Sequence, residues 1–246
     1  MRNSVALGRC GHGTHVGKVR PHNEDSYLVD AEFGFSVLAD GMGGHEGGEI
    51  ASQIVANSVS ADIHDGKMMV DALVNAHNAV LYAAKNGGGR LGMGSTAVAI
   101  RLDEESFEIA WVGDSRAYCW DGEQLIQITK DHSLVQQMID EGSITAEEAS
   151  THPRRNYITQ SMGMPESQEL SVGQIEGRLY SGYQFLLCSD GLTDEVTHSE
   201  ISGILGLDLD EQQKADRLIQ RAVDNGGADN ITVVLFSAPD SAPLKE

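Results

Sequence analysis

The feature that most constrains this chain is an apolar run that stops at an acid followed by glycine. Residues 33–38 are apolar and partly β-branched, which predicts a buried strand. Asp40-Gly41 and two further glycines follow, and helical periodicity begins near Glu49. A carboxylate at a strand end, beside a backbone that turns sharply, is a suitable seat for a hard divalent cation. A lone Asp-Gly pair would be better explained as an ordinary turn.

The same arrangement recurs at three later places. Asp114 and Asp190 each follow an apolar run and lie next to a glycine, and Asp229 shortly precedes the apolar run 231–236. Strand ends that are distant in sequence can meet at one rim of a sheet, where unpaired carboxylates would repel one another and require a cation. Oxygen ligands without HExxH or Cys/His spacing favour Mg²⁺ or Mn²⁺ over zinc. Each acid alone is explained as a turn or cap residue, but four matching contexts favour a shared site.

The charge of the chain limits its partners. The 246 residues carry a formal charge of −20, which repels nucleic-acid backbones and anionic lipid, so we expect neither nucleic acid nor a membrane as partner. A phosphorylated substrate would need a local positive source, either metal or arginine. Arg20 is the candidate, because its planar fork can grip two phosphoryl oxygens. The alternative is a surface arginine paired with Glu24.

The hydrophobic pattern predicts one α+β domain over residues 1–246. A polar excursion at about 131–160 is expected to be a mobile flap and not a second domain. Residues 1–17 receive no assignment. The expected strands cover residues 26–29, 33–38, 94–100, 107–112, 116–120, 170–175, 183–188 and 231–236. The expected helices cover residues 49–63, 134–141 and 211–223, and a further helix begins at residue 70 and ends at Asn86-Gly87-Gly88.

The cysteines and the apolar segments favour a reducing cytoplasm. Cys10, Cys119 and Cys188 form neither a CxxC pair nor a disulfide framework. No apolar stretch approaches the ~20 residues that span a bilayer, and Val5-Ala6-Leu7 is too short for a signal core. None of the cysteines has an arginine six positions further on, which argues against a cysteine phosphatase.

Six motifs occur in the order seen in one enzyme family. They are Arg20-Pro21-His22-Asn23-Glu24-Asp25, Asp40-Gly41-Met42-Gly43-Gly44-His45, Gly94-Ser95-Thr96-Ala97, Val112-Gly113-Asp114-Ser115-Arg116, Ser189-Asp190-Gly191-Leu192-Thr193-Asp194 and Asp229-Asn230-Ile231-Thr232. From about residue 13 to 237 the chain resembles the PPM/PP2C family of metal-dependent protein serine/threonine phosphatases, and the compact bacterial members most. The resemblance implies a four-layer α-β-β-α sandwich, two antiparallel sheets flanked by helices.

The resemblance also implies a role for each site residue. Asp40 would bridge two metals, the Gly41 carbonyl would bind one, and Asp190 and Asp229 the other. Glu24 and Asp25 would act through metal-bound waters, and Asp114 would hold a third metal with Asp190. Arg20 would bind the substrate phosphate. Thr96 and Asn230 would belong to the supporting hydrogen-bond shell.

Hydrolysis then follows from the chemistry of two divalent ions. Mn²⁺ or Mg²⁺ ions roughly 4 Å apart lower the pKa of a bridging water, and the hydroxide attacks phosphorus in line. Many relatives carry a histidine where this chain has Met42, so the general acid is unassigned, and His45 is expected to be structural or exposed. We expect a monomer that acts on phosphorylated serine/threonine proteins and opposes a Ser/Thr kinase. The alternatives are a non-catalytic regulator and a phosphatase for a small phosphoester.

Overall fold

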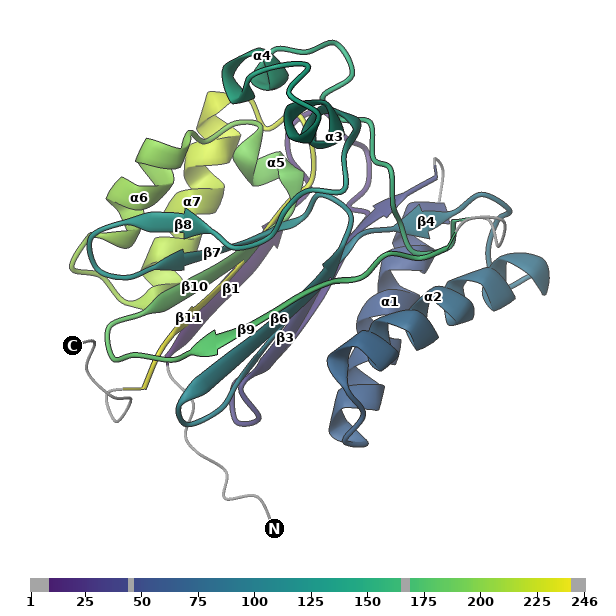
Figure 1. The fold of residues 1–246 in the computed structure, drawn as a ribbon, viewed down its shortest axis with the longest axis horizontal. Helices are drawn as coiled ribbons and strands as arrows, with labels where there is room; N and C mark the ends of the chain where they lie inside the picture. Colours follow the sequence, from purple (N-terminus) through teal and green to yellow (C-terminus); the bar gives the residue numbers. More distant parts are fainter. Residues whose placement is uncertain (1–8, 44–46, 165–168, 240–246) are drawn as a thin grey trace.

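A computed structural model describes residues 9–43, 47–164 and 169–239. The described long helices lie at residues 47–64, 69–85 and 211–225, and strands and short helices make up most of the rest (Figure 1). In chain order the elements are β1 (Cys10–His15), β2 (Asp25–Asp30), β3 (Phe35–Met42), α1 (Gly47–His64), α2 (Met69–Lys85), β4 (Gly94–Ser95), β5 (Ala97–Leu102), β6 (Ser106–Val112), β7 (Arg116–Trp120), β8 (Leu125–Gln127), α3 (Leu134–Asp140), α4 (Ala146–Ser150), β9 (Gly173–Arg178), β10 (Gln184–Cys188), α5 (Asp190–Thr193), α6 (His198–Leu205), α7 (Glu211–Asn225) and β11 (Ile231–Ser237).

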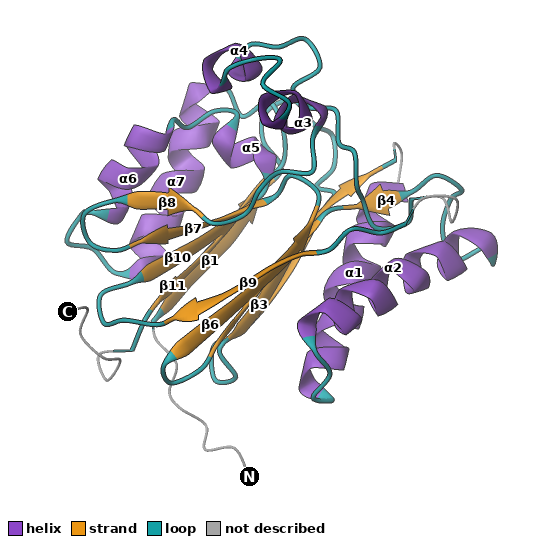
Figure 2. Ribbon diagram, in the orientation of Figure 1, coloured by secondary structure: helices purple, strands orange, loops and turns teal. Residues whose placement is uncertain are grey.

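Two antiparallel sheets lie face to face between layers of helices (Figure 2). The first sheet has five strands in the order β1-β11-β10-β7-β8, and the second has six, with β2-β3-β5-β6-β9 as its path and β4 paired with β3. Helices α1 and α2 cover the outer face of the second sheet, and α5, α6 and α7 cover that of the first. The predicted four-layer α-β-β-α sandwich is confirmed.

Alternation of side chains along the central strands builds these layers. In β3, Leu38 packs between the two sheets, whereas Val37 packs beneath α1 and α2. In β11, Val234 packs between the sheets, whereas Val233 packs beneath the helices of the other outer layer. Successive side chains of a strand point to opposite faces, so a strand covered on both faces is apolar throughout. Uninterrupted apolar runs therefore predicted these strands.

Several strands differ from the prediction: β8 was not predicted, and the strand predicted over residues 94–100 is divided at Thr96 into β4 and β5. Residues 10–15, which received no assignment, form β1 and pair with β11 from Cys10 opposite Phe236 to His15 opposite Ile231. The glycines of β1 hide its pattern: a Cβ on Gly11 would fall 2.2 Å from the backbone of Glu211, so the glycine lets α7 lie close. Strand β9 begins at Gly173, later than the predicted residue 170.

Helices α4 and α6 were not predicted from the hydrophobic pattern, because both are short. Each begins at a reciprocal capping box, in which a threonine and a glutamate three residues later bond each other's backbone. The pairs are Thr145 with Glu148 and Thr197 with Glu200. The Thr-x-x-Glu spacing is the signal that reveals such a helix in a sequence. None of the described helices is long and apolar enough to cross a membrane.

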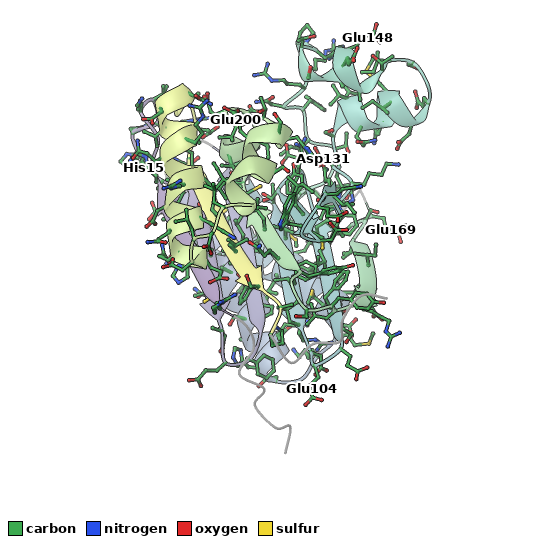
Figure 3. All side chains as sticks on the ribbon, turned by 90° about the vertical axis from the view of Figure 1, so that its left-hand side faces the viewer. His15, Glu104, Asp131, Glu148, Glu169 and Glu200 are labelled. Carbon is green, nitrogen blue, oxygen red and sulfur yellow. The ribbon has the colours of Figure 1, made fainter. Side chains whose placement is uncertain are left out.

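The flap leaves one sheet and returns to the other, since it connects β8 to β9 and carries α3 and α4. Asp131 lies at its base and Glu148 at its far end (Figure 3). Its neck is closed by backbone hydrogen bonds: the amide of Leu134 donates to the carbonyl of Tyr157 at 2.9 Å, and that of Thr159 to the carbonyl of His132 at 2.7 Å. The loop is therefore pinned where it joins the sandwich.

Candidate metal centre

Asp25 and Asp40 lie side by side, because they are register partners on β2 and β3. Asp25 Oδ2 accepts hydrogen bonds from Ser189 Oγ at 2.9 Å and Thr232 Oγ1 at 2.6 Å, which come from the other sheet. Burial raises the pKa of Asp25 to about 6 in spite of these bonds. Burial, and then the neighbouring Asp25 carboxylate, raise the pKa of Asp40 well above its ordinary value. Two acids thus meet where the ends of both sheets come together.

Asp190 and Asp114 line a second part of the same region, a cavity of about 650 Å³ beneath the flap. Asp190 begins α5 directly after β10, and Asp114 lies in the turn between β6 and β7. Burial, with the Asp131 carboxylate adding to it, raises the pKa of Asp114 to about 6. Burial and then the Asp114 carboxylate raise the pKa of Asp190 well above its ordinary value. Mutual repulsion therefore links these acids.

Arg20 lies at the site and is paired with Asp229. Its Nη2 donates to Asp229 Oδ2 at 2.7 Å, and this bond is the main reason why the pKa of Arg20 is raised. Asp229 Oδ1 accepts a bond from the backbone amide of Asn230 at 2.8 Å. The predicted alternative, an ion pair between Arg20 and Glu24, is not the contact that forms. Because 53% of its side chain is exposed, Arg20 also reaches solvent beside Asp229.

Asn230 fastens the segment that carries Arg20 and Glu24. Its Oδ1 accepts a bond from the Glu24 amide at 2.7 Å, and its Nδ2 donates to the carbonyls of Val16 and His22 at 2.9 Å each. The side chain thereby satisfies three backbone groups, and only 6% of the residue is exposed. This is the geometry of a supporting residue, which does not need to touch a ligand itself.

Thr96 fixes the end of β3. Its backbone amide donates to the carbonyl of Asp40 at 2.8 Å, and its Oγ1 accepts a bond from the amide of Asp40 at 3.0 Å. The same hydroxyl lies 2.7 Å from Ser115 Oγ, next to Asp114 in the chain. Ser95 Oγ also donates to the Asp40 carbonyl, at 2.9 Å. Both the amide and the carbonyl of Asp40 are consequently held by residues 95 and 96.

Glycines at the site allow close packing of backbones. A Cβ on Gly41 would fall 2.2 Å from the carbonyl oxygen of Gly48 in the first turn of α1, and one on Gly191 would fall 2.0 Å from the carbonyl oxygen of Asn230. A Cβ on Gly48 would meet Glu24 Cδ at 2.8 Å, which places the Glu24 carboxylate beside the start of α1. The N-terminus of a helix favours such a negative charge. At Gly41, then, close approach to α1 excludes a side chain.

Buried oxygens without partners test whether the acids fit a cation. Asp25 Oδ1, Asp114 Oδ1 and Asp190 Oδ1 are buried and accept no hydrogen bond. Such oxygens are costly to bury, and repulsion between neighbouring carboxylates adds to the cost. In the described part of the chain, no three acidic, histidine or cysteine side chains are already arranged to hold a metal ion. Some of the carboxylate oxygens are engaged elsewhere: Asp229 pairs with Arg20, and Asp25 Oδ2 accepts hydrogen bonds from two hydroxyls. The donor set itself, all oxygen and partly unpaired, fits a hard divalent cation.

The predicted site residues come together at one end of the sandwich, and hydroxyl residues that the prediction missed hold them there. Ser115, Ser189 and Thr232 each bond an acid or the residue that supports it. The signal was present, since Ser115 and Ser189 each adjoin a predicted acid in the sequence. Met42 ends β3 and borders a separate groove. His45 lies outside the described residues.

The fold and the site together define the class of α-β-β-α sandwiches whose carboxylates gather at one end of the two sheets. The sequence profile named "Protein phosphatase 2C" matches residues 13–232. The serine/threonine protein phosphatase PstP of Mycobacterium tuberculosis is 40% identical over 230 residues, which are 91% of this chain and 44% of PstP. The protein phosphatase PhpP of Streptococcus pneumoniae is 34% identical over 235 residues, 91% of this chain and 95% of PhpP.

Solved structures agree with the sequence matches. A crystal structure of the Mycobacterium tuberculosis phosphatase PstP/Ppp superposes with a TM-score of 0.85 at 35% identity and covers 94% of this chain and 99% of its own. The catalytic domain of PstP in complex with two manganese ions also gives a TM-score of 0.85, at 34% identity, and covers 95% of this chain and 99% of its own. The chain therefore belongs to the protein phosphatase 2C family, which confirms the predicted resemblance. It spans less than half the length of PstP.

Proposed function

We propose that this chain is a metal-dependent phosphatase that hydrolyses phosphoserine and phosphothreonine in proteins. The observation that carries the proposal is the set of buried, unpartnered oxygens on Asp25, Asp114 and Asp190, together with the half-exposed Arg20, which is paired with Asp229 near Asp190. Such carboxylate oxygens bind divalent cations, and an arginine guanidinium binds an anion. A phosphate monoester is the substrate that both would bind.

The proposed roles follow from what each side chain can offer. When bound, two Mn²⁺ or Mg²⁺ ions lower the pKa of water and offset the charge on the phosphoryl oxygens. Arg20 binds and orients the phosphate. Asn230 and Thr96 hold the segments on which the ligands lie. The proposed ligands are Asp40, Gly41 through its carbonyl, Asp190 and Asp229, with Glu24 and Asp25 acting indirectly and Asp114 joining Asp190 at a third ion.

Cellular partners are proposed from chemistry and from the relatives. The substrates would be phosphorylated proteins of a bacterial signalling system, with a Ser/Thr kinase as the opposing enzyme. The formal charge of −20 disfavours nucleic acid and membranes as partners. Free Cys10, Cys119 and Cys188 favour the cytoplasm. A monomer satisfies this chemistry, since every proposed ligand comes from one chain.

Turnover of p-nitrophenyl phosphate with Mn²⁺, before and after EDTA, tests the reaction. Asp40→Asn and Asp190→Asn should abolish turnover while circular dichroism stays unchanged, and Asp224→Asn on the exposed side of α7 is the matched control. A phosphothreonine peptide compared with small phosphoesters tests the substrate class. Hydrolysis that persists in EDTA, or a fully active Asp40→Asn enzyme, would contradict the proposal.

A further inference from the structure

A groove of about 490 Å³ begins where the candidate metal centre ends. Met42, which directly follows Gly41 in β3, lines the groove together with Gly94, its register partner in β4. Helix α2 contributes Leu81 and Ala84. The third contributor is the returning part of the flap, which runs beside β4 (Figure 1). The groove therefore lies between three elements, one of which carries the proposed metal ligands.

The returning segment is fixed in place, so the groove is formed in advance. The amide of Met162 donates to the carbonyl of Ser95 at 2.7 Å, and the amide of Ser95 donates back to Met162 at 3.2 Å. The amide of Gly163 donates to His77 Nδ1 on α2 at 3.2 Å. These bonds tie the flap's return to β4 on one side and to α2 on the other. A preformed groove binds without first having to be ordered.

The lining is mostly apolar and contains several flexible side chains. Met42, Met93 and Met164 lie along it with Leu91, which is 83% exposed. Methionine is flexible and polarizable, and suits surfaces that accept aliphatic side chains of varied shape. Lys85 is the one charged residue among the described lining residues, in a chain whose formal charge is −20. No aspartate or glutamate is among the described residues that line the groove.

The distance to the metal centre fits a short stretch of peptide. Met42 lies two residues beyond Asp40 in β3, about 7 Å at the rise of a strand. An extended peptide advances about 3.3–3.6 Å per residue. A peptide whose phosphate lies at Asp40 therefore brings a residue two or three positions away to the groove.

We propose that this groove binds a large aliphatic side chain of the substrate protein, two or three residues from the phosphorylated serine or threonine. The inference rests on the proposed function and adds a sequence preference to it. Leucine or methionine at that position matches the lining. A substrate with only small polar residues there gains nothing from the groove.

Two variants alter the groove without touching a proposed ligand. Ala84→Trp fills it from α2, and Leu91→Glu places a carboxylate at an exposed position of its lining. Ala61→Trp is the matched control, since Ala61 is an exposed residue of α1 away from the groove. If Ala84→Trp lowers Tm, Leu91→Glu still tests the groove, because a side chain this exposed contributes little to folding.

The assay uses Gly/Ser-based phosphothreonine peptides with a single leucine at each position from −3 to +3. We expect leucine two or three residues from the phosphothreonine to raise kcat/KM about ten- to a hundredfold over the all-serine peptide, as burial of one large side chain predicts. Ala84→Trp and Leu91→Glu should remove that gain, and Ala61→Trp should keep it. Turnover of p-nitrophenyl phosphate, which carries no aliphatic side chain for the groove, should stay within twofold in all variants.

A binding readout separates this inference from the proposed function. With Mg²⁺ present, the ¹³C-methyl NMR signals of Met42, Met93 and Met164 should shift when the leucine peptide is added, and not with the serine peptide. Equal kcat/KM for all peptides, a gain that survives both variants, or identical shifts with both peptides would overturn the inference. Failure of the wild-type enzyme to hydrolyse p-nitrophenyl phosphate would instead refute the proposed function, and the methyl shifts would then decide the groove alone.

Discussion

Replacing Asn230 by alanine removes the side chain that holds the Arg20 segment. Three hydrogen bonds are lost, one from the Glu24 amide and two to the carbonyls of Val16 and His22. A typical intramolecular hydrogen bond contributes about 1 kcal/mol net, so we expect the free energy of unfolding to fall by about 3 kcal/mol. The segment that places Arg20 would also loosen, which should raise KM for a phosphopeptide more than it lowers kcat.

Urea unfolding followed by tryptophan fluorescence measures this loss, and steady-state kinetics measure the second effect. Asn225→Ala is the control, because the Asn225 side chain is exposed and donates a hydrogen bond to the carbonyl of Glu195 at 2.7 Å. The control should lose about 1 kcal/mol or less. A loss for Asn230→Ala no larger than for the control would refute the view that this asparagine holds the segment.

Further predictions concern packing, pH and metal binding. Gly41→Ala should destabilise the fold severely, because its Cβ would lie 2.2 Å from the Gly48 carbonyl oxygen, whereas Gly203→Ala on α6 has open space and should stabilise by up to about 1 kcal/mol, both read from urea unfolding. In the exposed Asp30–His64 pair, the hydrogen bond from His64 lowers the pKa of Asp30, and the bonds to the Ser60 carbonyl and then to Asp30 raise the pKa of His64. The contribution of this pair to the free energy of unfolding is lost as pH falls through the lowered pKa of Asp30, and also as pH rises through the raised pKa of His64. Asp30→Asn should therefore lower the free energy of unfolding by less than about 1 kcal/mol near pH 6 and by nothing measurable at pH 9. An equal cost at both pH values would contradict this sign. Mn²⁺ should raise Tm with the logarithm of its concentration above Kd, and Asp190→Asn should reduce that shift, as differential scanning fluorimetry can check. An unchanged shift would exclude Asp190 as a ligand.

The fold could be predicted where burial on both faces makes a strand apolar. The runs that became β3 and β11 are such cases, and their acids and glycines marked the strand ends. Strand β1 escaped prediction because its glycines serve close packing against α7, and glycine carries no hydrophobic signal. Tertiary contact, not local propensity, decides such a strand.

The candidate site was predictable in its acids and not in its hydroxyls. Acids next to glycine at strand ends are rare enough to notice, whereas serine and threonine occur throughout the chain. Ser189 and Thr232 bond Asp25 because of the way in which the two sheets pack against each other, and no local sequence pattern reveals that packing. The pairing of Arg20 with Asp229 has the same origin, since the two residues are 209 positions apart.

The closed neck of the flap has an evolutionary consequence. Ser133 and Ile158 pair there as a β-bridge, so the two ends of the 24-residue loop between them are held together by the backbone of the flap itself. Lengthening, shortening or grafting this loop would leave the register of both sheets, and with it the acids, undisturbed. Selection can thus exchange this piece to suit new targets while the chemistry beneath it is inherited unchanged.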